Sequence, residues 1–98
     1  MHVQHRETSE LLRVAALYRF ARFDDCASLR PPLERLCRDQ GVRGTLLLAG
    51  EGINGTIAGP PDGIDRVLSH IRALPGCADL DVKFSQVETM PFDRLKVR

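Results

Sequence analysis

Three cysteines, Cys26, Cys37 and Cys77, are the side chains in this 98-residue sequence best suited to nucleophilic or metal chemistry. Their number is odd and no two have C-x-x-C spacing, so the sequence predicts neither a disulfide framework nor a metal site. Cys37 shares a helical face with leucines and Cys77 lies in a connection, which favours structural roles for both. Cys26 precedes a predicted helix, but the adjacent Asp24 and Asp25 oppose a thiolate there. We therefore assign no catalytic residue and no cofactor.

A glycine-rich motif is the second candidate for chemistry, with the literal G-x-G-x-x-G sequence Gly50-Glu51-Gly52-Ile53-Asn54-Gly55. A dinucleotide site needs this motif to leave a strand and open a helix, whose N-terminus then holds the pyrophosphate. Here Pro60 and Pro61 follow within a few residues and no helix fits, so the context test fails. We interpret the motif as structural: its glycines and Asn54 supply the positive φ values of a hairpin reversal.

Basic side chains are the third candidate, as contacts for an anionic partner. The net charge is only +1, so such contacts must come from local clusters. Alternation places Arg94, Lys96 and Arg98 on one face if that segment is extended. The candidate phosphate contacts of RNA are Arg22, Arg43, Lys83, Arg94, Lys96 and Arg98.

The elements that would position these residues follow a β-α-β-β-α-β order. Strands are predicted over residues 14–21, 43–49, 53–58 and 81–87, with the second and third joined as a hairpin. The first helix is expected to begin at a Ser28 cap, with Pro31 and Pro32 in its first turn, and to stop at Gly41. The second helix shows gapless helical periodicity in Ile64, Val67, Leu68 and Ile71.

This order predicts an α+β, ferredoxin-like sandwich, with two helices on one face of a four-stranded antiparallel sheet. In the first strand we expect Arg19 to point away from the core and Leu17 to lie on the open sheet face. The expected core layer of that strand is Val14, Ala16, Tyr18 and Phe20. An open face with apolar residues indicates a partner.

Composition bounds the class of protein. Apolar residues are 43% and charged residues 28% of the chain, which is typical of one globular domain. No apolar run approaches the roughly 20 residues of a membrane span, and the polar first ten residues do not resemble a signal peptide. We expect a cytoplasmic protein with no membrane partner.

One long segment carries a family resemblance: Gly41-Val42-Arg43-Gly44-Thr45-Leu46-Leu47-Leu48-Ala49-Gly50-Glu51-Gly52-Ile53-Asn54-Gly55-Thr56-Ile57-Ala58-Gly59. It closely resembles the N-terminal domain of the rhodanese-related bacterial tRNA uridine hydroxylases, which convert the wobble uridine of certain tRNAs to 5-hydroxyuridine. Further matches are Leu17-Tyr18-Arg19-Phe20, Lys83-Phe84-Ser85 and Pro91-Phe92-Asp93-Arg94-Leu95-Lys96-Val97-Arg98.

The resemblance implies an accessory domain of a longer protein. In that family the catalytic cysteine belongs to a following rhodanese-like domain, to which nothing here corresponds. We therefore expect a flexible extension over residues 1–13 and a ferredoxin-like, acylphosphatase-like domain over residues 14–92. Residues 93–98 would begin a truncated linker or strand toward the rhodanese-like domain. The expected role is to position tRNA, to pack the catalytic domain, or both.

Two other classes share the predicted order. An RNA-recognition module stacks bases on aromatic residues of its first and third strands, and the third strand here has none. An acylphosphatase-like enzyme needs an arginine in a phosphate-cradling loop and an asparagine that places water; Arg22 and Asn54 are the nominal candidates. The loop around Arg22 is acidic and lacks glycine, which disfavours a phosphate cradle.

Overall fold

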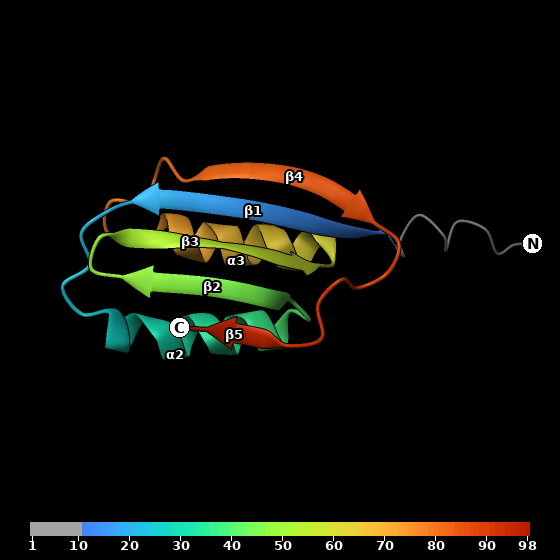
Figure 1. Ribbon diagram of the computed structural model, residues 1–98, viewed down its shortest axis with the longest axis horizontal. Coiled ribbons are helices and arrows are strands. Elements are labelled where there is room, and N and C mark those ends of the chain that lie inside the picture. The colour runs from blue at the N-terminus through green and yellow to red at the C-terminus, as the bar shows by residue number, and fades with distance from the viewer. Residues whose placement is uncertain (1–10) are drawn as a thin grey trace, which may run out of the picture.

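The computed structural model describes residues 11–98, in which two helices cover one face of a sheet (Figure 1). The helices are α2 (Cys26–Asp39) and α3 (Pro61–Arg72). The strands are β1 (Leu12–Phe20), β2 (Arg43–Ala49), β3 (Gly52–Gly59), β4 (Asp81–Val87) and β5 (Leu95–Val97). The predicted order and the α+β, ferredoxin-like sandwich are confirmed.

The sheet has one strand more than the four that we predicted. Its order within the described residues is β4-β1-β3-β2-β5, and β5 pairs with β2 in parallel while the other neighbours are antiparallel. Backbone hydrogen bonds from Gly44 to Arg94 and from Arg98 to Leu46 hold β5 in place. The alternation of this segment was predicted, but its pairing with β2 was not.

The core lies between the sheet and the two helices. The predicted apolar face of α3 is fully buried, as are Leu33 and Cys37 of α2. They pack against β-branched and leucine side chains of the sheet: Leu46, Leu48, Ile53 and Ile57. Full burial of one such side chain stabilises the fold by roughly 1.5–3 kcal/mol, so this layer fixes both helices on one sheet face.

The start of α2 differs from the prediction. The helix begins at Cys26, and the Asp25 carboxylate accepts a hydrogen bond from the backbone N–H of Ser28 at 3.3 Å, so Asp25 is the cap. Pro31 and Pro32 consequently lie in the second turn, where two intrahelical N–H donors are missing and the helix nevertheless continues. Both prolines are exposed, so their rings crowd no part of the core.

The two faces of β1 are the reverse of those predicted. Ala15 and Leu17 are buried under the helices, whereas Tyr18 and Phe20 are 52% and 80% exposed on the opposite face. The prediction was wrong for the whole expected core layer, which was Val14, Ala16, Tyr18 and Phe20. The buried face also carries Arg13 and Arg19, so the alternation of charged and apolar residues favoured the wrong orientation.

β2 and β3 form the predicted antiparallel hairpin, and β3 starts at the second glycine of the glycine-rich motif. Gly52 and Gly55 have φ of +146° and +155° and lie inside the strand, not in the turn. A Cβ atom would overlap the carbonyl oxygen of Arg19 at Gly52 and that of Thr45 at Gly55. These glycines therefore allow neighbouring strands to approach closely.

β1 begins two residues before the predicted first strand. Of the predicted flexible extension, residues 1–10 lie outside the described residues. No helix of the described chain is long and apolar enough to cross a membrane. No group of three or more His, Cys, Asp or Glu side chains with metal-ligating geometry occurs among residues 11–98.

Candidate functional site

The sheet face turned away from the helices, here called the open face, is the candidate site. It is the face toward the viewer in Figure 1. Strand register places one row of residues across all five strands: Lys83, Ala16, Thr56, Thr45 and Lys96. The lysines at its two ends are separated by four strand spacings, or about 19 Å between Cα atoms. Two ammonium groups thus stand at opposite edges of one sheet face.

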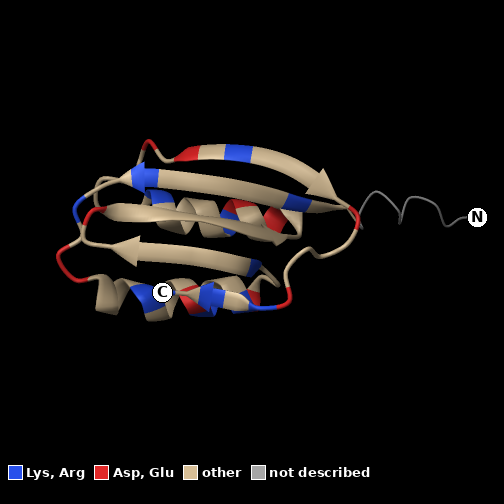
Figure 2. Cartoon of the chain, in the orientation of Figure 1, with Lys and Arg blue, Asp and Glu red and all other residues tan. Residues whose placement is uncertain are grey.

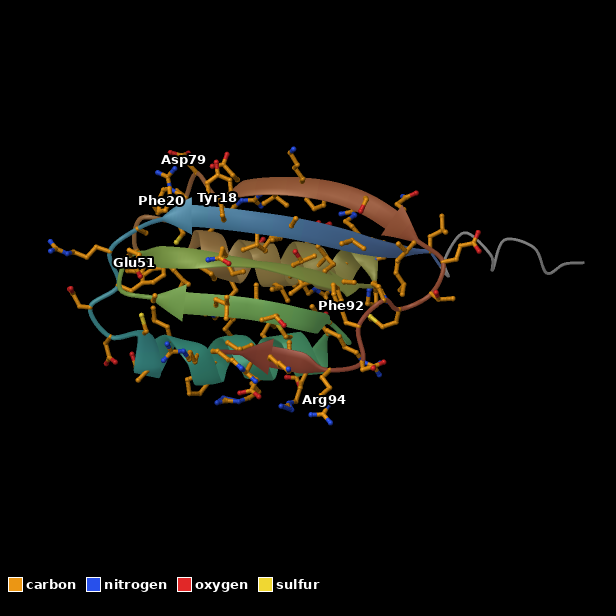
Figure 3. The ribbon with its side chains drawn as sticks, in the orientation of Figure 1. Tyr18, Phe20, Glu51, Asp79, Phe92 and Arg94 are labelled. Carbon is orange, nitrogen blue, oxygen red and sulfur yellow. The ribbon has the colours of Figure 1, made fainter. Side chains whose placement is uncertain are left out.

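The next row holds the aromatic part of the open face. Tyr18 pairs with Asp81 on β4 and with Asn54 on β3, and Asn54 pairs with Leu47 on β2. Phe20 lies two residues farther along β1, with its ring centroid 6.2 Å from that of Tyr18 in an edge-to-face arrangement. Figure 3 shows both rings toward the end of the sheet where Glu51 lies, and Arg94 toward the opposite end.

Two shallow hollows adjoin on the open face, with Tyr18 and Asn54 lining both. One, of about 550 Å³, extends to Lys83 and Asp81 between β1, β3 and β4. The other, of about 340 Å³, extends to Phe20 and to other residues of β1, β2 and β3. The Tyr18 ring therefore separates two neighbouring depressions whose floor is the sheet backbone and small side chains.

The structure brings most of the predicted phosphate contacts to this face. Arg43 and Lys96 lie there by strand register, and Arg94 shares a small hollow with Lys96. Lys83 lies at the other edge, and Arg98 continues the alternation of β5. In Figure 2 the basic residues of β4 and β5 stand at the two outer edges of the sheet.

Acidic residues are few on this side of the molecule. Asp81 is the single acidic residue on the five strands of the described chain. Asp93 lines the hollow that holds Arg94, and Glu51 lines the hollow beside Phe20. The open face is therefore electropositive although the whole chain is almost neutral.

Arg22 is the predicted contact that the structure does not place on the open face. It is exposed in the loop between β1 and α2. In this loop the N–H groups of Ala21 and Phe23 donate to the carbonyl oxygens of Glu51 and Gly50, at 3.0 and 3.1 Å. These amides are occupied by the hairpin turn and cannot hold a phosphate. Among the described residues that line the two hollows beside Tyr18, Asn54 is present and Arg22 is not.

The cysteines lie in the protein interior or at its margin. Burial, with a smaller contribution from the Glu34 carboxylate, raises the pKa of Cys37 to about 12. Burial also raises the pKa of Cys77, and Arg19 partly offsets that effect. Both side chains are fully buried, while Cys26 is half-buried against the core. A buried thiol with a raised pKa stays protonated at neutral pH and is a poor nucleophile.

Tyr18 and Phe20 are the residues that sequence reasoning missed as surface groups. Charge misled the prediction, because Arg13 and Arg19 lie on the same alternation as Ala15 and Leu17. Charged residues favour solvent, so this alternation was assigned to the open face. In the structure Arg19 donates from Nε to the carbonyl oxygen of Gly76 at 3.1 Å, so its charge reaches the protein edge past the core.

Sequence comparison relates the chain to tRNA-modifying enzymes. It is 58% identical to the tRNA uridine(34) hydroxylase of Gluconobacter oxydans, over 94% of this chain and 29% of that protein. It is 65% identical to the enzyme of the same name from Caulobacter vibrioides, over 88% of this chain and 27% of that protein. The chain thus spans less than a third of the length of these relatives.

Solved structures match the fold. The BLUF protein BlrB in its dark state superposes with a TM-score of 0.69 at 22% identity, over 91% of this chain and 72% of that one. An acylphosphatase from Coxiella burnetii gives a TM-score of 0.62 at 9% identity, over 97% of this chain and all of that one. Residues 12–98 match the family model described as the UPF0176 acylphosphatase like domain. With nearly its whole length matched in this way, the chain belongs to the UPF0176 acylphosphatase-like domain family.

Proposed function

We propose that this chain is the accessory domain of a tRNA uridine hydroxylase and that its open face binds the tRNA. The observation that carries the proposal is the convergence of Arg43, Lys83, Lys96 and Arg94 on one sheet face. Because the chain is highly identical to tRNA uridine(34) hydroxylases, we infer that the nucleic acid bound by this face is tRNA.

The arrangement suits a phosphate backbone. Lysine is a compact point charge on a flexible stem, so Lys83 and Lys96 can reach phosphates at both edges of the sheet without fixed geometry. Contacts of this kind fix the position of an RNA and carry no sequence information.

Hydroxylation of the wobble uridine would take place elsewhere in the protein. We place the catalytic cysteine in a rhodanese-like domain of the same protein, against which this domain would also pack. The two buried thiols, Cys37 and Cys77, are part of the hydrophobic core. The domain's contribution is binding and orientation: it would hold the tRNA so that the uridine meets the catalytic domain.

Hydrolysis of acyl phosphates, the activity of the acylphosphatases that share this fold, is disfavoured by the loop after β1. Two of its backbone N–H groups are engaged by the hairpin turn, and the exposed Asp24 and Asp25 add negative charge to the same loop. The Asp25 carboxylate caps α2 and thereby presents a negative charge at the N-terminus of that helix.

Binding of a labelled anticodon stem-loop RNA to the 98-residue chain tests the proposal. The double variant Lys83→Gln/Lys96→Gln should weaken binding about tenfold, as expected for two exposed charge contacts of up to about 1 kcal/mol each. The charge-matched control Arg35→Gln/Arg72→Gln removes two exposed arginines from the helices and should leave the affinity unchanged. Equal losses in both variants would show that the open face is not the RNA site.

A further inference from the structure

We propose that Tyr18 and Phe20 form a stacking platform for unpaired nucleobases, so that the open face binds a single-stranded segment of the tRNA. This inference rests on the proposed function and deepens it, because phosphate contacts alone do not distinguish a loop from a duplex. A base stacked on an aromatic ring must first be free of its own helix.

The rings of Tyr18 and Phe20 are exposed to solvent on the open face. Tyr18 is 52% and Phe20 80% exposed, so neither contributes much buried area to the fold. Both project from β1, an inner strand that pairs with β4 on one edge and with β3 on the other. Flat aromatic side chains on an inner strand offer their faces to a planar ligand, as in modules that bind single-stranded RNA.

Two hollows beside Tyr18 offer space for a planar ligand. The Tyr18 ring separates depressions of about 550 and 340 Å³, each within the size range of small-molecule sites. A planar base in either hollow would therefore lie beside this ring. The exposed Asn54 amide lines both hollows and can donate to and accept from the edge of a base.

The charges around Tyr18 indicate where the base and where the phosphate backbone of the RNA would lie. Lys83 lies one row away from Tyr18 on the neighbouring strand, while the carboxylate residue Asp81 is directly opposite Tyr18. Asp81 repels a phosphate and accepts hydrogen bonds from the amino groups of bases. The backbone is accordingly expected beside Lys83 and Lys96, with a base turned inward onto Tyr18.

This combination favours RNA over a protein surface as the occupant. Cations stand at both edges of this face, where they can contact the phosphates of an RNA backbone (Figures 2 and 3). In a single-stranded RNA, the bases would stack on the aromatic rings and the phosphates would contact the neighbouring cations.

The test compares two RNAs on the 98-residue chain, a hairpin with an unpaired loop and a blunt duplex of equal length. Tyr18→Ala and Phe20→Ala should each weaken hairpin binding about fivefold to a hundredfold and leave duplex binding unchanged. Tyr18→Phe keeps the ring and should keep the affinity. Quenching of a fluorescent adenine analogue in the loop should be lost in Tyr18→Ala and retained in Tyr18→Phe.

Phe84→Ala is the matched control, because Phe84 is 53% exposed and pairs with the buried Ala15 on the helix side of the sheet. It should not change the affinity for either RNA. Unchanged hairpin binding in Tyr18→Ala, or equal losses for hairpin and duplex, would overturn the stacking platform. A persisting effect of Lys83→Gln/Lys96→Gln would then still support the proposed function. Absence of binding to either RNA would overturn both.

Discussion

Replacement of Gly55 with alanine is expected to destabilise the domain by about 2–5 kcal/mol. An L-residue at a φ of +155° carries about 1–3 kcal/mol of backbone strain. The new Cβ would also overlap the Thr45 carbonyl oxygen and approach Leu46 Cα to 3.0 Å. These are backbone atoms of β2, so β2 and β3 must separate locally, at a cost of about 1 kcal/mol for each hydrogen bond lost.

Thermal and denaturant unfolding of the 98-residue chain measure this loss. For a domain of this size, about 2 kcal/mol lowers Tm by roughly 8–16 °C. The matched control is Gly50→Ala in the adjacent turn, where the nearest atom to a Cβ is the Phe23 carbonyl oxygen at 3.9 Å. That substitution should change stability by less than about 0.5 kcal/mol. Equal melting of the two variants would refute the requirement for glycine inside β3.

Three further predictions concern pH, catalysis and salt. Because burial raises the Cys37 pKa from 9.0 to about 12, the unfolded chain loses this proton first as pH rises. Stability should therefore fall by about 1 kcal/mol between about pH 8 and 10 in denaturant titrations, less steeply in Cys37→Ala. The 98-residue chain alone should not hydroxylate uridine, transfer sulfur or hydrolyse an acyl phosphate. Any of these reactions running faster than in a protein-free control would contradict the accessory role. The logarithm of RNA affinity should fall with that of salt concentration with a slope no steeper than about −3.5, for five single-strand phosphate contacts; a steeper slope would implicate other cations.

The elements with one unambiguous pattern could be predicted from sequence. In α3, Ile64, Val67 and Leu68 satisfy helical spacing, and no other secondary structure would bury them together. The β2–β3 hairpin follows from a short glycine-containing connection between two apolar strands. Local chain geometry determines both features, so the sequence carries their signal within a few residues.

Features decided by distant parts of the chain could not be predicted. The buried face of β1 includes Arg19, whose guanidinium is accommodated by the carbonyl oxygen of Gly76, far away in sequence. The pairing of β5 with β2 likewise joins segments separated by two strands and a helix. The basic residues could be named from sequence. That they share one surface could be known only from the register of all five strands.

β5 also changes what the edge of the sheet offers to other molecules. Without it, β2 would expose its unpaired backbone groups along Leu46, Leu47 and Leu48, an apolar, strand-forming segment of the kind that recruits identical chains into aggregates. Three residues cover that edge, and the new edge carries Lys96, whose charge opposes strand addition. Any recombinant version of this domain that ends before Leu95 would therefore expose a self-associating edge, however well its helices and core fold.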